Sequence, residues 1–277
     1  MAENRIEAAL ERARQRRKDD KRAESARTAV VEQPQVPRQP MPRFPELAVD
    51  AEGCVARRIL LSEHGFRWNA GADASYRMLR TRILQRVRSN RWTTIGVTSP
   101  SQGDGKSLTT LNLALSIARE GNSNVFLLDL DMRNPTLCNN LGVVPPVDMN
   151  EYLAGDGRPE DLLFSIGVDN LLLAGSVTST NRASELLATR GVEKLFSYIR
   201  SIAPQPLVLV DLPPVLATDD ALIVAPMIDA CLLVLSEGRS RRDSAAEAIA
   251  LLSEFTLAGI VLNRSRAAIK DYHYSYS

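Results

Sequence analysis

Short runs of apolar residues alternate with longer amphipathic stretches over most of the chain beyond residue 92. The runs lack the polar alternation of half-exposed strands, which is typical of strands buried on both faces. Such strands, separated by helices, predict an α/β fold with a mostly parallel sheet and helices on both faces. The expected strands are residues 93–98, 125–128, 171–174, 207–210, 231–235 and 260–262, and the main helices between them are 108–120, 184–201 and 241–255.

The first third of the chain has a different pattern. Residues 4–27 are charged and carry only a thin apolar stripe at helical spacing, which favours a charged helical or disordered arm over residues 1–33. Five prolines between residues 34 and 45 predict an extended linker. Residues 70–91 combine six arginines with apolar positions spaced as in an amphipathic helix.

Composition narrows the function classes. Of the 277 residues, 44% are apolar, enough for a sizeable core, and the formal net charge of +1 gives no field that would attract nucleic acid. The three cysteines lie far apart without a CxxC pair, so we expect reduced, structural thiols. Neither a signal peptide nor a membrane-spanning run is evident, so a cytoplasmic location is expected.

The clearest motif lies between the first expected strand and its helix. Residues 99–107 read SPSQGDGKS, which fits the phosphate loop GxxxxGK[ST] except that Pro100 replaces the first glycine. Glycines allow the tight turn that aims backbone amides at a phosphate, and the lysine reaches the outer phosphates. The alternative is a glycine-rich turn that only begins a helix. The expected nucleotide-binding residues here are Gly103, Asp104, Gly105, Lys106, Ser107 and Leu108, and Ser107 is also an expected magnesium ligand.

Acidic residues end two further strands. Asp129 and Asp131 end the second run, and Asp211 follows four apolar residues in the form of a Walker B strand. Parallel strands bring their carboxyl ends to one edge, so these acids should meet the phosphate loop. One could orient a metal and another accept a proton, although solvated acids at strand ends are the simpler alternative. Asn263 ends the last strand and could bind an adenine edge or cap a loop.

The three motifs in this order, with DxDxR at the second, resemble the bacterial tyrosine kinase (BY-kinase) family over about residues 70–277. The stretches 76–82 and 181–187 and the tyrosine-rich end add to the resemblance. It implies a P-loop NTPase-type kinase domain over residues 46–268, with ATP and Mg²⁺ as cofactors. It also implies transfer of the ATP γ-phosphate to tyrosines, chiefly in the tail of a neighbouring subunit, residues 269–277.

The resemblance also implies roles for single residues. Lys106 would contact phosphate, Asp129 would be the general base, and Asp131 and Asp211 would belong to the magnesium shell, with the division between Asp129 and Asp131 left open. Arg133 would belong to the same catalytic motif. The expected phosphoacceptors are Tyr272, Tyr274 and Tyr276.

One departure from the family concerns subunit contacts. The family pattern Glu-x-x-Arg-x-x-Arg is represented by Arg77 and Arg80, but Ala74 stands where the glutamate belongs and Asp73 is its neighbour. Self-association is expected, with its size open, and these arginines could equally be a solvated helix face.

The expected function is a tyrosine autokinase that regulates capsule or exopolysaccharide synthesis. Its expected partners are a membrane adaptor of the chain-length-determinant type, which recruits it to the inner face of the plasma membrane, and a tyrosine phosphatase. The alternative is a partitioning or septum-site ATPase acting as a dimerisation switch, although residues 100–103 lack the signature lysine of those proteins. A nucleotide-binding regulator without phosphotransfer is a third class.

Overall fold

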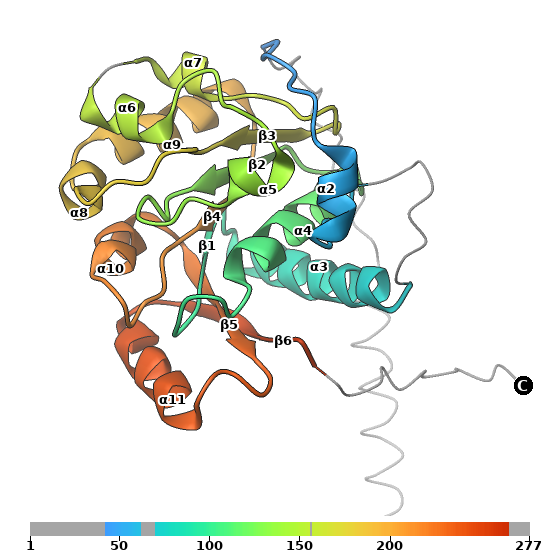
Figure 1. Ribbon diagram of the computed structural model, residues 1–277, viewed down its shortest axis with the longest axis vertical. Coiled ribbons are helices and arrows are strands. Elements are labelled where there is room, and N and C mark those ends of the chain that lie inside the picture. Colours follow the sequence, from blue (N-terminus) through green and yellow to red (C-terminus); the bar gives the residue numbers. More distant parts are fainter. Residues whose placement is uncertain (1–41, 62–69, 156, 266–277) are drawn as a thin grey trace, which may run out of the picture. The chain divides into compact units, whose positions relative to one another are not determined.

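A six-stranded parallel sheet forms the centre of the protein (Figure 1). The computed structural model describes residues 42–61, 70–155 and 157–265, all within one compact unit. The strand order is β3-β2-β4-β1-β5-β6, and every pairing is parallel. The predicted α/β fold is therefore confirmed. The strands are β1 (Thr94–Thr98), β2 (Val125–Asp129), β3 (Leu171–Ala174), β4 (Leu207–Asp211), β5 (Ala230–Ser236) and β6 (Leu257–Asn263).

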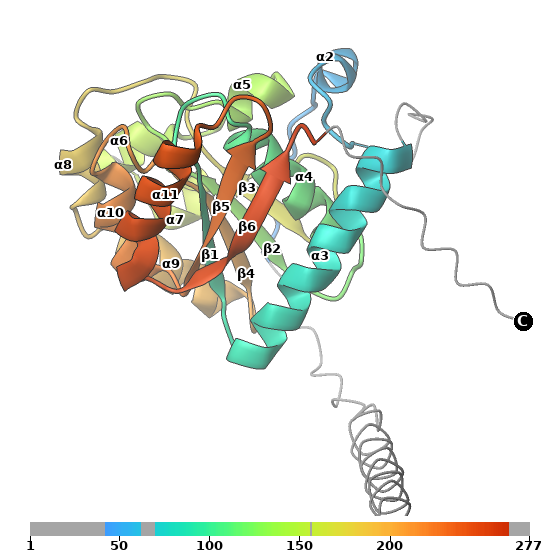
Figure 2. The same cartoon turned by 90° about the horizontal axis from the view of Figure 1, so that it is seen from below.

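Helices connect the strands and cover the sheet (Figures 1 and 2). Most predicted helices are present, but the single helix expected at 184–201 is wrong: two helices, α8 and α9, replace it. The chain breaks between them where the Thr189 hydroxyl accepts the amide of Gly191 at 3.2 Å. The helices are α2 (Ala51–Ala56), α3 (Ala70–Asn90), α4 (Lys106–Ala118), α5 (Leu137–Leu141), α6 (Met149–Ala154), α7 (Pro159–Leu162), α8 (Ala183–Leu187), α9 (Gly191–Ile202), α10 (Asp220–Val224) and α11 (Arg242–Leu251), with 3₁₀ turns at Ala225–Met227 and Leu252–Glu254.

The sheet separates two hydrophobic clusters. Successive residues of a strand face opposite sides, so Leu127 and Leu209 pack with α2, α3, α4 and α5. Phe126 and Leu128 pack with α6, α8, α9 and α11 on the other side. This two-sided burial explains the unbroken apolar runs in the sequence. Cys54, Cys138 and Cys231 are free and buried in these clusters, as expected for structural thiols.

The segment before α2 also lies on this domain. The amide of Ser165 donates to Pro45 O at 2.8 Å, and the amide of Leu47 donates to Ser165 O at 2.9 Å. Phe44 packs against the cluster that contains Phe126. Within the described parts of the chain, no helix has the length and hydrophobicity needed to cross a bilayer.

Stability should depend on the sheet interior far more than on its edge. Leu209 is fully buried in β4, whereas Leu262 on the edge strand β6 is 54% exposed. We expect Leu209→Ala to lower the free energy of unfolding by about 2–5 kcal/mol, because it removes buried methyl groups and leaves a cavity. The matched Leu262→Ala change should cost less than about 1 kcal/mol. Urea denaturation of both variants tests this, and similar losses in the two would contradict the described sheet order.

Candidate active site

The glycine-rich loop connects β1 to α4 at the carboxyl end of the sheet. Gly103 and Gly105 have φ angles of 81° and 94°, a region that only glycine enters without strain. Gly105 is the N-cap of α4, so Lys106 and Ser107 begin the helix. The partial positive charge at the amino end of this 13-residue helix therefore faces the same space as the loop amides.

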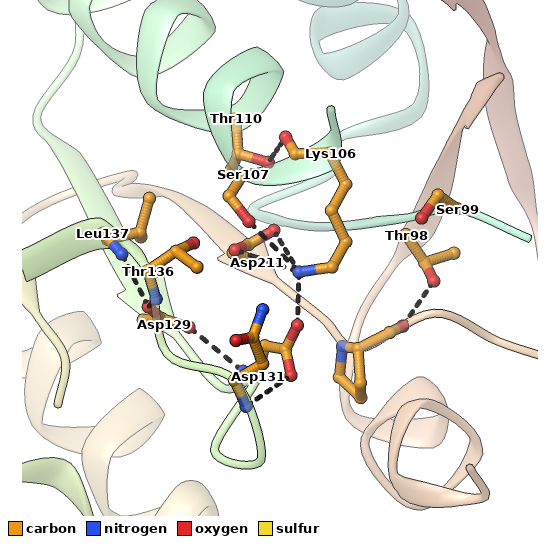
Figure 3. A network of polar contacts seen from close by, with 12 residues as sticks. Thr98, Ser99, Lys106, Ser107, Thr110, Asp129, Asp131, Thr136, Leu137 and Asp211 are labelled. Atoms are coloured by element: carbon orange, nitrogen blue, oxygen red, sulfur yellow. Dashed lines mark hydrogen bonds and ion pairs between the residues drawn. The ribbon is translucent and has the colours of Figure 1, made fainter. Parts of the chain in front are cut away.

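Lys106 joins the three sequence motifs (Figure 3). Its Nζ lies 2.6 Å from Asp131 Oδ2 and 3.3 Å from Asp211 Oδ2, and it donates to Ser107 Oγ at 3.1 Å. All three charged side chains are buried. The prediction that the strand-end acids meet the phosphate loop is confirmed.

Burial and ion pairing have opposite effects on the pKa values of this cluster. Burial alone would lower the pKa of Lys106, but the carboxylates of Asp211 and Asp131 raise it, so the ammonium stays protonated. Burial raises the pKa of Asp211, and the charge of Lys106 opposes that change. The ionised form of this site is therefore stabilised by ion pairing rather than by solvent.

Asp129 lies beside this ion pair in a different setting. It is 1% exposed, and its Oδ2 accepts the amides of Thr136 and Leu137 at 3.0 Å each, while its Oδ1 accepts the amide of Asp131 at 3.1 Å. Burial, with the nearby charge of Asp211, raises its pKa to about 7. A carboxylate with a pKa near neutrality is suited to accept and release a proton.

The oxygen-rich donor set fits Mg²⁺. Carboxylates of Asp131 and Asp211 and the hydroxyl of Ser107 are hard ligands of the kind this ion prefers. In the described ranges no cluster of three or more carboxylate, histidine or cysteine side chains could hold a metal by itself. Mg²⁺ usually uses one or two protein carboxylates together with substrate phosphates, so an incomplete protein shell beside a phosphate loop matches its chemistry.

Arg133 connects the segment after β2 to two helices. Its Nε donates to Asp220 Oδ2 at 2.6 Å, and its Nη2 donates to Asp220 Oδ1 at 3.2 Å and to Ser184 Oγ at 2.9 Å. Asp220 is buried at the start of α10, and Ser184 lies in α8. Although burial opposes the change, the hydrogen bonds from Arg133 and Ser184 lower the pKa of Asp220. Arg133 thereby fixes the segment that carries Asp131.

Sequence reasoning missed Asp220 and Ser184. The stretch 181–187 contributes to the family resemblance, but nothing in its spacing links it to Asp220, which lies 36 residues after Ser184. The one available signal was the adjacent pair Asp219 and Asp220 shortly after the Walker B strand.

Two predicted nucleotide-binding residues have other contacts. Asn263 Nδ2 donates to the backbone oxygen of Asp104 at 3.0 Å, so in the structure it caps the phosphate loop, the second of its two expected roles. Leu108 packs against the cluster beneath α4. Asp104 is buried, and its Oδ2 accepts the amide of Ser101 at 3.1 Å. The predicted phosphoacceptors and the arm lie outside the described residues.

The arginines of α3 have intramolecular partners. Arg77 pairs with Asp73 at 3.1 Å, one turn earlier in the helix. Arg80 pairs with Glu120 at 3.1 Å and donates to Ser116 O, also at 3.1 Å. Arg80 therefore fastens α3 to the end of α4, and a role of these arginines in subunit contacts stays a prediction.

The parallel sheet, the glycine-rich loop before α4 and the buried acids after β2 and β4 define a protein of the P-loop nucleotide-binding class. No protein-family model matches the chain. It is 29% identical to tyrosine-protein kinase YwqD of Bacillus subtilis over 203 residues, 73% of this chain and 84% of that protein. It is 26% identical to tyrosine-protein kinase CpsD of Streptococcus agalactiae over 218 residues, 78% of this chain and 93% of that protein.

The chain is also similar to solved structures, among them a tyrosine kinase domain. The BceF tyrosine kinase domain matches with a TM-score of 0.64 and 29% identity, covering 80% of this chain and 93% of that one. The septum site-determining protein MinD of Pyrococcus horikoshii, solved with Mg-ADP, shares the fold with a TM-score of 0.52 and 19% identity, over 62% of this chain and 72% of that one. The comparisons confirm the resemblance to the bacterial tyrosine kinases and the enzyme class that it implies, protein-tyrosine kinase.

The pKa of Asp129 predicts an unusual pH dependence of stability. The pKa is about 7 in the folded protein against an ordinary value of 3.8, so between these values the folded state holds a proton that the unfolded state releases. Stability should therefore fall as the pH rises from 5 to 7, by about 2 kcal/mol, because each pH unit is worth about 1.4 kcal/mol until the folded-state pKa is approached, where the slope halves. Asp129→Asn should remove this loss, as measured by urea denaturation at pH 5, 6, 7 and 8.

The matched control is Asp243→Asn, which makes the same chemical change at a carboxylate 91% exposed on α11. This variant should follow the pH dependence of the original protein. If Asp129→Asn and the original protein lose stability in parallel between pH 5 and 7, Asp129 does not have the raised pKa.

Proposed function

We propose that this protein is an ATP- and Mg²⁺-dependent protein-tyrosine autokinase that regulates capsule or exopolysaccharide biosynthesis. The observation that carries the proposal is the convergence of Lys106, Ser107, Asp131 and Asp211 beside Asp129. This arrangement combines phosphate-binding and magnesium-binding groups with a carboxylate able to take a proton at neutral pH.

In the proposed reaction, a tyrosine oxygen attacks the γ-phosphorus of ATP, and the bond to the β-phosphate oxygen breaks to release ADP. Asp129 accepts the proton of the tyrosine hydroxyl. Lys106 stabilises negative charge on the phosphates, and Ser107, Asp131 and Asp211 hold the magnesium shell. Bound Mg²⁺ supplies charge neutralisation at the phosphate oxygens. The Arg133 contacts keep the Asp131 segment in place during this reaction.

The proposed acceptors are the tyrosines near the end of the sequence. Tyr272, Tyr274 and Tyr276 lie within five consecutive positions, so one short segment offers three hydroxyl acceptors. Several phosphates on one tail would repel a neighbouring subunit, so phosphorylation would weaken self-association.

The proposed partners and location follow from the same function. A cytoplasmic kinase of polysaccharide export needs a membrane adaptor, proposed here to be of the chain-length-determinant type, and a tyrosine phosphatase that resets the tail. Residues 12–22 hold seven basic and two acidic residues, which suits contact with an anionic membrane surface. Loss of membrane association on deletion of residues 1–41, which leaves Phe44 and Pro45 on the domain, would support this role, and unchanged association would refute it.

The second candidate is an ATPase switch of the partitioning or septum-site type. The fold shared with MinD is the observation in its favour. Against it, residues 100–103 contain no lysine, and such a switch has no use for a tyrosine-rich tail. The two candidates differ in whether phosphate is transferred to protein or released to water.

The test is incubation of the purified full chain with Mg²⁺ and ATP, followed by phosphopeptide mapping by mass spectrometry. We expect phosphotyrosine in the tail, and we expect Lys106→Met to lower it about a hundredfold or more, because it removes charge stabilisation of the transferred phosphate. The combined Tyr272→Phe, Tyr274→Phe and Tyr276→Phe variant should lose the signal, whereas Tyr198→Phe in α9 should retain it. Phosphate release without phosphotyrosine, even in the presence of candidate adaptors, would favour the ATPase switch.

A further inference from the structure

Three consecutive backbone oxygens of the phosphate loop each accept a hydrogen bond from a side chain at the carboxyl end of β5 or β6. Arg239 Nη2 donates to Gln102 O at 3.3 Å, and Arg264 Nη2 donates to Gly103 O at 3.2 Å. Asn263 Nδ2 donates to Asp104 O at 3.0 Å. Arg239 follows β5, Asn263 ends β6 and Arg264 follows it, so the donors come from two neighbouring strand ends.

The direction of these bonds determines where the loop amides point. In a trans peptide the C=O and the N–H of the next residue point in opposite directions. The described residues contain no cis peptide bond. Drawing the oxygens of residues 102, 103 and 104 toward β5 and β6 therefore turns the amides of Gly103, Asp104 and Gly105 the other way. These are amides that a phosphate loop uses to bind an anion.

The two loop glycines leave space that two of these donor side chains occupy. A Cβ built on Gly103 would lie 2.6 Å from Arg239 Nη2, and one built on Gly105 would collide with Asn263 Nδ2. The glycines therefore allow the positive φ angles and also make room for the side chains that cap the loop. Pro100 replaces the first glycine of the usual motif. The backbone between Pro100 and Lys106 is stabilised by these three side-chain hydrogen bonds as well as by its own turns.

We propose that Arg239, Asn263 and Arg264 are positioning residues that hold the phosphate loop in its anion-binding conformation. They act on the loop backbone, so they strengthen binding of any nucleotide that carries a β-phosphate, ADP and ATP alike. The inference rests on the proposed function only in requiring a nucleotide. It does not depend on transfer of phosphate to tyrosine.

The experiment measures equilibrium binding of ADP and ATP, each with Mg²⁺, to the full chain. The combined Arg239→Ala and Arg264→Ala variant should bind both nucleotides about tenfold more weakly, because it loses two exposed hydrogen bonds worth about 0.7 kcal/mol each. The matched control is Arg242→Ala, which removes one arginine three residues from Arg239, at the exposed start of α11. This control should bind as the original protein does, and the combined Arg239→Lys and Arg264→Lys variant should retain part of the affinity lost in the alanine variant.

Asn263→Asp is an independent test of the same inference. The side chain keeps nearly the same shape, but its carboxylate cannot donate to Asp104 O. It should also weaken ADP and ATP by similar factors, and kinase assays should show a raised KM for ATP with kcat changed less. The midpoint temperature of thermal unfolding is measured for each variant. We expect nucleotide affinity to fall while this temperature stays the same as in the original protein.

Two results would overturn the inference. One is nucleotide affinity equal to that of Arg242→Ala. The other is weaker binding of ATP alone, which would assign the arginines to direct contact with the γ-phosphate. Loss of nucleotide affinity in a protein that forms no phosphotyrosine would leave this inference standing and remove the proposed kinase function, so the two failures are distinguishable.

Discussion

The buried ion pairs of Lys106 are the interaction on which the site depends. The ammonium lies at the first turn of α4 and contacts Asp211 at the end of β4 and Asp131 just after β2. A buried carboxylate without a cationic partner would shift its pKa and become neutral. The charge of Lys106 opposes the rise that burial causes in the pKa of Asp211, and the lysine joins the helix to two strands of the sheet.

Polar contacts hold the segments around this ion pair in addition to the apolar packing of Leu130, Met132 and Leu212. Thr98 in β1 donates its hydroxyl to Pro213 O at 2.7 Å, which ties the strand before the phosphate loop to the segment after Asp211 (Figure 3). Arg133 ties the segment after β2 to α8 and α10. The irregular segments at the carboxyl edge of the sheet are thus fixed from several sides, as preorganised electrostatic catalysis requires.

Asp129 and Asp131 show how two acids two residues apart come to differ. Asp131 faces the Lys106 ammonium, whereas Asp129 faces the backbone amides of Thr136 and Leu137. Both are buried, and burial together with the nearby charge of Asp211 raises the pKa of Asp129 to about 7. That difference supports the assignment of the base to Asp129 in the proposed mechanism.

The sequence by itself determined the six strands, the helices α3, α4 and α11, and the grouping of the charged residues of the central site. Unbroken apolar runs predict strands buried on both faces, and parallel strands bring the residues that follow them to one edge, so the sequence alone groups Lys106, Asp131 and Asp211. Contacts between residues distant in the chain were decided by tertiary structure. The break between α8 and α9, the pairing of Arg133 with Asp220, and the capping of the phosphate loop from β5 and β6 depend on strand order and side-chain direction, which local pattern does not encode.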